Sequence, residues 1–232
     1  MLTFERTVIS QGSFSLSADV SLPAQTIIAL IGPSGAGKST LLGAIAGFLQ
    51  PTQGRVIWNG SDLTGVAPGA RPVSMLFQDN NLFPHLTAAQ NIGLGLRPDL
   101  RLSASESAAC AAALEEVGLQ DYGDRKPGAL SGGQQSRVAL ARVLVADRPL
   151  VLLDEPFAAL GPALKDEMLD LVKGKLSAAG KTVVMVTHDP ADARRVAAYA
   201  ALVAEGKVFA PVATDILLNH PPPSLAAYLG NA

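Results

Sequence analysis

A glycine-rich segment near the start of the chain carries residue types that bind phosphate groups. Residues 32–40 read GPSGAGKST and fit the pattern G-x-x-x-x-G-K-[ST]. In such a loop the backbone N–H groups wrap the phosphates, which also meet the positive end of the following helix. We expect Lys38 to reach the β- and γ-phosphates and the hydroxyl of Ser39 to bind Mg²⁺. The residues expected to bind a nucleotide here are Gly32, Pro33, Ser34, Gly35, Ala36, Gly37, Lys38, Ser39 and Thr40.

Two adjacent carboxylates end an apolar segment later in the chain. Residues 151–155 read VLLDE, which is typical of a buried strand that ends in Asp154 and Glu155. Beside a phosphate loop, Asp154 can hold Mg²⁺ and Glu155 can polarise the attacking water, because phosphoryl transfer depends mainly on positioning and charge stabilisation. Without the phosphate loop, the pair would fit solvated acids at a strand end equally well.

Gln78 and His188 also stand directly after apolar segments or one residue beyond them. Gln78 can reach Mg²⁺ or the water, and His188 can bond the γ-phosphate. Single glutamines and histidines at strand ends are commonly plain hydrogen-bonded surface groups, so spacing alone leaves both roles open.

A second helix start with adjacent glycines lies at residues 130–134, which read LSGGQ. Ser131 or a neighbour can cap the helix, and free N–H groups at such an end can bind an anion. The segment has no lysine, so it cannot complete a nucleotide site alone. It is either an ordinary capped helix or the part of a two-fold dimer that closes the partner's site. In the second case the contacting residues are Ser131, Gly132, Gly133 and Gln134.

The elements that must position these groups are predicted to form an α/β fold. Four apolar segments lack alternation, as is typical of strands buried on both faces of a parallel sheet. Each is followed by one of the polar groups above, and ligands of open α/β sheets bind beyond the carboxyl ends of the strands. We therefore expect four polar strand ends to face one site. The segments are residues 27–31, 73–77, 150–153 and 182–186.

Other segments predict the rest of the domain. Residues 39–48 are expected to form a helix with Leu41, Leu42, Ile45 and Phe48 on one side. Residues 4–9, 14–22 and 55–58 alternate more and predict an antiparallel sheet at one flank. We predict one domain over residues 1–232, in which 1–83 and 137–232 form the nucleotide-binding core and the Ala-rich segment 84–136 is an inserted helical subdomain.

Composition limits the classes of function. Hydrophobic residues make up 48% of the 232 residues, enough for a core, and a net charge of −2 without a basic run gives no reason to expect nucleic acid.

Cys110 is the only cysteine and is expected to be a buried apolar residue. The N-terminus lacks a signal-peptide pattern, and the longest apolar run, 196–204, is far shorter than the about 20 residues that span a bilayer. We expect a cytosolic chain that contacts a membrane only through a partner.

Residues 32–40, Gln78, 130–134, 151–155 and His188, in this order, resemble the nucleotide-binding subunit of ATP-binding-cassette (ABC) transporters. The likeness covers nearly the whole chain. It implies a P-loop NTPase of the ABC ATPase type, working as a homodimer whose head-to-tail ATP sandwich drives transmembrane permease subunits from the cytoplasmic face of the inner membrane. It also implies that Gln78 and His188 take part in hydrolysis, that ATP and Mg²⁺ are bound, and that the LSGGQ segment completes the partner's site.

A longer segment resembles the ATPase subunit of bacterial thiamine importers, although other importer ATPases share parts of it. Residues 71–87 read RPVSMLFQDNNLFPHLT, and residues 90–96 read QNIGLGL. This resemblance implies uptake of thiamine or thiamine phosphates together with a periplasmic solute-binding protein. It also implies that residues 79–87 lie near the groove that receives a helix of the membrane subunit.

The chain departs from the family pattern at two places. The family usually has Ser-Ala-Leu-Asp after Glu155-Pro156-Phe157, whereas this chain has Ala158-Ala159-Leu160-Gly161, so the two sites of the dimer are expected to be coupled more loosely. An aromatic residue near the N-terminus usually stacks on adenine. Here residues 11–13 read QGS and Phe14 is a poor substitute, and because base stacking contributes ~1–3 kcal/mol, affinity is expected to be weaker.

Three hypotheses follow from the sequence. The first is a transport motor that energises import, of thiamine or of another small solute. The second is a soluble cassette ATPase acting on DNA or ribosomes, but such proteins usually carry tandem cassettes or a long coiled coil, and the sequence shows neither. The third is a nucleotide-gated switch that dimerises but barely hydrolyses ATP. Gly161 and the absent adenine-stacking aromatic residue motivate it, and the intact Lys38, Asp154, Glu155 and His188 argue against it.

Overall fold

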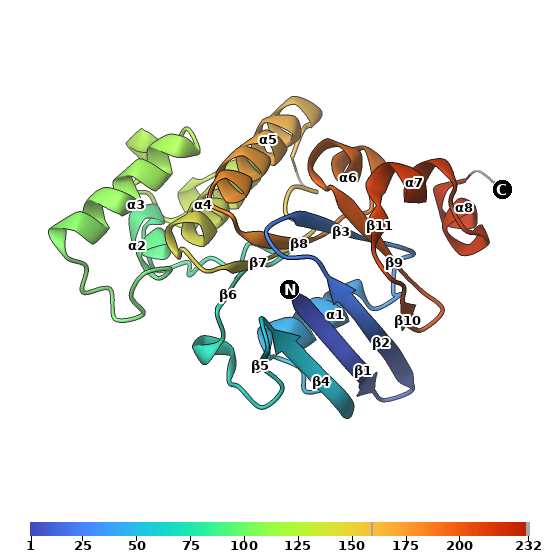
Figure 1. Ribbon diagram of the computed structural model, residues 1–232. Coiled ribbons are helices and arrows are strands. Elements are labelled where there is room, and N and C mark those ends of the chain that lie inside the picture. Colours follow the sequence, from blue (N-terminus) through green and yellow to red (C-terminus); the bar gives the residue numbers. More distant parts are fainter. Residues whose placement is uncertain (159, 231–232) are drawn as a thin grey trace.

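The computed structural model describes residues 1–158 and 160–230, and an eleven-stranded sheet runs through them (Figure 1). The hydrogen-bonded order is β5-β4-β1-β2-β10-β9-β3-β8-β7-β6, and β11 pairs with β9. The strands are β1 (Leu2–Gln11), β2 (Phe14–Leu22), β3 (Ile27–Ile31), β4 (Gln53–Trp58), β5 (Ser61–Asp62), β6 (Val73–Leu76), β7 (Leu150–Asp154), β8 (Thr182–Val186), β9 (Tyr199–Ala204), β10 (Lys207–Val208) and β11 (Val212–Ala213).

The helices lie on both faces of this sheet (Figure 1). The α-helices are α1 (Lys38–Ala46), α2 (Ala88–Gly93), α3 (Ala104–Glu116), α4 (Gly132–Val145), α5 (Pro162–Ala178), α6 (Pro190–Val196), α7 (Thr214–Asn219) and α8 (Pro223–Leu229). Short 3-10 turns occur at η1 (Pro68–Ala70), η2 (Gln120–Tyr122) and η3 (Pro127–Ala129).

The predicted parallel core is confirmed. Strands β9, β3, β8, β7 and β6 pair in parallel, in that order. Alternate residues of β3 face two different hydrophobic cores: Ile27, Ala29 and Ile31 face the one that includes α2–α6, whereas Ile28 and Leu30 face the one that includes α1. Continuous apolar character in β3, β7 and β8 is therefore required, because both faces of these strands exclude water.

The predicted antiparallel flank is also present. Strand β1 pairs antiparallel with both β2 and β4, and β4 pairs with β5. Buried residues of this flank, among them Phe4, Leu16 and Trp58, share one core with α1, so α1 is packed between the flank and the parallel strands.

Three expectations about burial and strands were tested. Cys110 is buried, as predicted. Phe48 is 56% exposed and the prediction that it lies on the buried side of α1 was wrong, because Gly47 adopts φ 92° and ends the helix before it. The prediction that β6 is buried on both faces was also wrong, since β6 lies at the edge of the sheet and Val73, Ser74 and Met75 are only half-buried.

Strand β9 was not expected from the sequence, although its residues belong to the longest apolar run. Helices α2 and α3 and the first five residues of α4 (132–136) fall in the segment expected to be an inserted subdomain. The expected boundary between residues 136 and 137 lies inside α4, which continues to Val145. The division into core and insertion remains a prediction.

Candidate nucleotide-binding and catalytic site

The glycine-rich loop links β3 to α1, and close packing explains two of its glycines. Gly32 adopts φ +154°, and a Cβ there would lie 2.0 Å from the carbonyl oxygen of Val203 on β9. Gly37, the N-cap of α1, adopts φ +103°, and a Cβ there would lie 2.6 Å from the ring of Phe14. Only glycine fits both the conformation and the space, so β9 and Phe14 hold the loop from two sides.

The ammonium group of Lys38 is hydrogen-bonded to the loop. Its Nζ donates to the carbonyl oxygens of Gly32 at 2.7 Å and Pro33 at 2.8 Å, and the residue is 7% exposed. Burial lowers the pKa of Lys38, and the carboxylates of Glu155 and Asp154 partly oppose that effect. The first turn of α1 therefore presents a desolvated cation beside free loop amides, an arrangement suited to phosphate.

Asp154 lies at the end of β7 beside the start of α1. The Ser39 hydroxyl donates to its Oδ1 at 3.0 Å, and Asp154 is 7% exposed. Burial raises the pKa of Asp154, and the Ser39 hydrogen bond and the charge of Lys38 only partly offset this. A buried carboxylate whose charge is not fully compensated, next to a hydroxyl oxygen, fits a hard divalent cation. In the described part of the chain no group of three or more His, Cys, Asp or Glu side chains is arranged to hold a metal, so such a cation would also need oxygens of the nucleotide.

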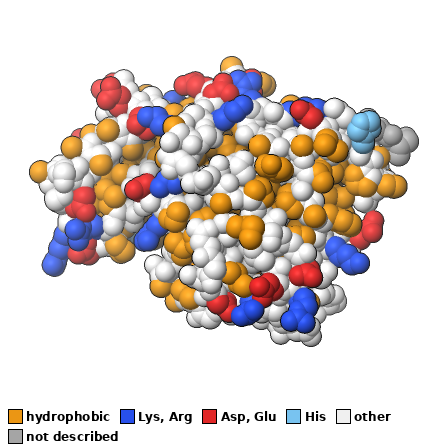
Figure 2. Space-filling model, in the orientation of Figure 1, with side chains coloured by type: hydrophobic (Ala, Val, Ile, Leu, Met, Phe, Trp, Pro, Cys, Tyr) orange, Lys and Arg blue, Asp and Glu red, His pale blue; other side chains and the backbone are white. Residues whose placement is uncertain are grey.

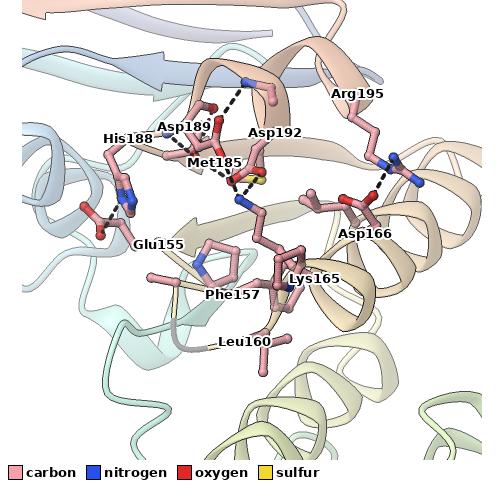
Figure 3. Close-up of a pocket in the computed structure, with 16 residues that line it drawn as sticks. Glu155, Phe157, Leu160, Lys165, Asp166, Met185, His188, Asp189, Asp192 and Arg195 are labelled. Atoms are coloured by element: carbon pink, nitrogen blue, oxygen red, sulfur yellow. Dashed lines mark hydrogen bonds and ion pairs between the residues drawn. The ribbon is translucent and has the colours of Figure 1, made fainter. Parts of the chain in front are cut away.

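Glu155 has an unusual backbone conformation. Its φ is +43°, a region that costs a non-glycine residue about 1–3 kcal/mol, and its N–H donates to Val186 on β8 at 3.2 Å. The sharp turn ends the strand and directs the side chain toward His188, whose Nδ1 lies 3.2 Å from Glu155 Oε2 (Figure 3). Two residues that are 33 positions apart are thus in contact at the ends of adjacent parallel strands.

Gln78 follows β6 by two positions, and a tethered loop comes after it. Asn80 and Asn81 adopt φ values of +61° and +44°, and the guanidinium of Arg142 on α4 donates to both carbonyl oxygens at 2.9 Å. No motif in the sequence identified Arg142. It connects the helix that begins with the LSGGQ segment to the loop after Gln78.

These elements enclose a pocket of about 490 Å³, a size typical of small-ligand sites. It brings together the end of β1, the start of β2, the glycine-rich loop, Gln78 and Glu155. Phe14 therefore borders the pocket, although the sequence analysis treated it only as a poor substitute for the usual aromatic residue. The lining residues are Gln11, Phe14, Ser34, Gly35, Gly37, Lys38, Ser39, Thr40, Gln78 and Glu155.

A second cavity of about 370 Å³ lies on the other side of Glu155, between α5 and α6 (Figure 3). His188 lines this cavity rather than the first one. Its polar lining includes Lys165, Asp189 and Asp192, which the sequence analysis did not select. Only the position of Asp189 directly after His188 could have drawn attention to them.

The LSGGQ segment does not reach the 490 Å³ pocket of its own chain. Ser131 caps α4: its Oγ accepts from the Gln134 N–H at 3.3 Å, and the Gln134 side chain accepts from the Ser131 N–H at 2.9 Å. None of Ser131, Gly132, Gly133 and Gln134 lines that pocket. The predicted cap is confirmed, and the role of the segment at a nucleotide remains a prediction.

The departure at residues 158–161 lies at the start of α5. Gly161 is the N-cap of α5 and offers no side chain to cap it, whereas an aspartate there could accept a backbone hydrogen bond. Ala159 lies outside the described residues. The expected effect of Gly161 on coupling remains a prediction.

Known proteins are similar to this chain in sequence and in fold. A family model described as ABC transporter matches residues 16–158. A relative named "Thiamine import ATP-binding protein ThiQ" from Cereibacter sphaeroides is 60% identical over 230 residues, which cover 99% of this chain and 100% of that protein. Relatives of the same name from Ruegeria sp. and Vibrio cholerae are 58% identical (99% of this chain and 100% of that protein covered) and 50% identical (92% and 90%).

Two solved structures share the fold. A dimeric ATP-binding cassette in a post-hydrolysis state, bound to ADP and Pi, gives a TM-score of 0.83 at 29% identity and covers 92% of this chain and 99% of that chain. A dimeric bacterial ABC transporter cassette gives 0.82 at the same identity and coverage. The matched family model spans more than half of the chain and the relatives match nearly all of it, and on this evidence the chain belongs to the ABC transporter family.

Proposed function

We propose that this chain is the ATP-hydrolysing subunit of an ABC importer whose cargo is thiamine or a thiamine phosphate. The main support for ATPase activity is that the glycine-rich loop, Gln78 and Glu155 line one pocket. Beside this pocket, the Ser39 hydroxyl donates a hydrogen bond to Asp154. The support for thiamine is the name of the relatives, which match the chain over nearly its whole length at up to 60% identity.

In this proposal the loop residues 32–40 bind the phosphates of ATP. Ser39, Asp154 and Gln78 would hold Mg²⁺ together with phosphate oxygens, and the bound ion would neutralise charge that develops on the β- and γ-phosphates. The Ser39–Asp154 pair already places two of these oxygens within 3.0 Å of each other. Lys38 adds a second positive charge at the same phosphates.

Glu155 orients the attacking water and accepts its proton. The contact between Glu155 Oε2 and His188 Nδ1 holds the carboxylate in one orientation when that nitrogen carries the proton, which leaves the other ring nitrogen free to face the γ-phosphate. The backbone strain at Glu155 supports a role in the site, because such conformations persist where the surrounding structure requires them.

The LSGGQ segment would complete the site of a second copy of the chain. It lies outside its own pocket, Gly132 leaves open space at the helix start, and both solved neighbours are dimers. We infer a head-to-tail homodimer in which residues 131–134 close over the partner's nucleotide.

The importer would work at the cytoplasmic face of the inner membrane through permease subunits and a periplasmic solute-binding protein. Among the helices of residues 1–158 and 160–230, none is both long and apolar enough to span a bilayer. The face in Figure 2 shows acidic and basic side chains interspersed, which offers no support for a nucleic-acid partner.

One pair of variants tests the ATPase and the dimer. Glu155→Gln is expected to abolish phosphate release and to accumulate a dimer with MgATP, and adding Ser131→Arg is expected to prevent that dimer. Steady-state phosphate release and light scattering measure the two effects. A monomer for Glu155→Gln at saturating MgATP would contradict the sandwich. Phosphate release by the unchanged chain that equals that of Glu155→Gln would instead favour the nucleotide-gated switch.

A pull-down from native membranes tests the cargo. We expect mass spectrometry to identify a multispanning permease, with a thiamine-binding protein encoded beside it. A permease encoded beside a different binding protein would support the importer ATPase but contradict thiamine as the cargo. Soluble companions alone would favour a soluble cassette ATPase acting on DNA or ribosomes.

A further inference from the structure

One lysine joins helix α5 to the loop that carries His188. Lys165 lies in the first turn of α5, and its Nζ is 2.6 Å from Asp189 Oδ2 and 2.6 Å from Asp192 Oδ1 (Figure 3). Its side chain is 20% exposed, and that of Asp192 is 14% exposed. The cation therefore sits in a largely enclosed site between two carboxylates, where the interaction is stronger than at an open surface.

The two carboxylates are themselves fixed to the loop around His188. Asp192 Oδ2 accepts from the Thr187 hydroxyl at 2.9 Å, and that same hydroxyl oxygen accepts from the Asp189 N–H at 3.1 Å. Asp189 Oδ1 also caps α6 by accepting from the Ala191 N–H at 2.9 Å. The residues on both sides of His188 thus belong to one hydrogen-bonded network that ends at Lys165.

The other end of this connection leads to Glu155. Helix α5 begins at Pro162, only a few residues after Glu155, so the chain that leaves Glu155 enters the helix that carries Lys165. Lys165 therefore ties the segment after Glu155 to the loop of His188, and these two segments carry the 3.2 Å contact between Glu155 Oε2 and His188 Nδ1.

The electrostatics agree with a firm connection. The hydrogen bond from Lys165 lowers the pKa of Asp189. Burial by itself would lower the pKa of Lys165, but its hydrogen bonds to Asp189 and Asp192 outweigh that effect, and the pKa of Lys165 is raised. Removal of one member of such a part-buried cluster leaves the other charges uncompensated.

A second contact comes from the C-terminal helix. The hydroxyl of Tyr228 on α8 donates to the carbonyl oxygen of His188 at 3.2 Å. This bond restrains the backbone at His188 but does not reach Thr187, Asp189 or Asp192. Lys165 remains the group that connects the loop to α5.

We propose that Lys165 is a positioning residue for hydrolysis, which holds the His188 loop against the segment after Glu155 and so keeps the His188 ring in contact with the Glu155 carboxylate. The inference deepens the proposed ATPase function and rests on it. Lys165 touches neither the nucleotide pocket nor Glu155, so its effect is expected on turnover rather than on nucleotide binding.

The test compares three variants of the full chain by phosphate release at varied MgATP. Lys165→Met keeps most of the length but removes the charge, Lys165→Arg keeps the charge, and Arg195→Met is the matched control. Arg195 also bridges α5 and α6, through Asp170 at 2.6 Å and Asp166 at 3.2 Å, but it lies one residue before the end of α6, away from His188.

We expect Lys165→Met to lower kcat by about 10-fold to 100-fold, in the range that small misplacements of reacting groups cost, with KM within about twofold of the unchanged chain. Lys165→Arg is expected to recover most of kcat, and Arg195→Met to leave it unchanged. If Lys165→Met does not fold, Asp189→Asn replaces it: the amide oxygen can still cap α6, and Lys165 keeps only Asp192 as a carboxylate partner. The expected result is then a smaller fall in kcat, again with KM unchanged.

Several results would overturn the inference. It is wrong if Lys165→Met or its substitute keeps the original kcat, if Lys165→Arg fails to restore it, or if Arg195→Met loses as much, since that would reflect general packing of α5 on α6. A failure of the proposed function looks different: the unchanged chain would release phosphate no faster than Glu155→Gln.

Discussion

Arg71 is expected to be one of the largest single contributors to the stability of this fold, although it lies outside the nucleotide pocket. It is 1% exposed and donates to four backbone carbonyl oxygens. Nη1 bonds Ala44 at 2.7 Å and Ile45 at 2.8 Å in the last turn of α1. Nε bonds Val66 at 2.8 Å and Nη2 bonds Thr64 at 3.2 Å. The guanidinium thus fastens the phosphate-binding helix to the segment that leads into β6.

The expected cost of Arg71→Met follows from these four bonds. A buried acceptor that loses its partner costs ~1–3 kcal/mol, so the two buried carbonyls of Ala44 and Ile45 would cost ~2–6 kcal/mol. The carbonyls of Val66 and Thr64 are part-buried and add less, because water can replace the lost donor. Removing a buried charge returns several kcal/mol of desolvation penalty. Burial indeed lowers the pKa of Arg71, and the charge of Asp62 only partly opposes this. We expect a net loss of about 3 kcal/mol, which corresponds to a fall in Tm of roughly 6–12 °C for a chain of this length.

Thermal and urea unfolding of the nucleotide-free chain measure this loss. The stability of Arg71→Lys is expected to lie between those of the unchanged chain and Arg71→Met, because one ammonium group cannot reach all four carbonyls. Arg55→Met is the control: Arg55 pairs with Glu5 at 2.5 Å but its side chain is 57% exposed, so the expected cost is below about 1 kcal/mol. The assignment of Arg71 as a stabilising clamp is refuted if the free energy of unfolding of Arg71→Met lies within about 1 kcal/mol of that of the unchanged chain, since this is the contribution of an exposed surface pair.

Two further predictions concern the pocket. Burial raises the pKa of Asp154 above its unfolded value, so the stability linked to this group is present at low pH and is lost as pH rises through the folded pKa. Asp154→Asn should therefore raise the Tm of the chain at pH 7 without nucleotide or metal. The gain should fade as pH falls through the raised pKa of folded Asp154 and be gone by about pH 3.9, and a lower Tm at pH 7 would contradict this. Phe14 borders the pocket over Gly37, and Phe14→Ala is expected to weaken ATP binding by ~1–3 kcal/mol, roughly 5-fold to 150-fold in Kd. Calorimetric titration measures it against Phe14→Tyr, and equal affinities for Phe14→Ala and the unchanged chain would remove Phe14 from the site.

The local chemistry and most of the strands could be predicted from the order of residues alone. Apolar runs followed at once by polar groups located β3, β7 and β8 and the groups after them, because strands buried on both faces must be apolar throughout. The phosphate loop and the Ser131 cap were readable for a similar reason: both depend on a few consecutive residues and their own backbone groups.

Contacts between distant segments could not be predicted and became visible in the folded chain. Strand β9 was not recognised, although it packs against Gly32 and makes glycine necessary there. The bonds of Arg71 to α1 and of Lys165 to Asp189 span 27 and 24 positions, and no spacing rule connects such residues. Each of these side chains was one of many charged residues in the sequence. Their partners became identifiable once the order of strands in the sheet and the packing of helices on its two faces had brought the elements together.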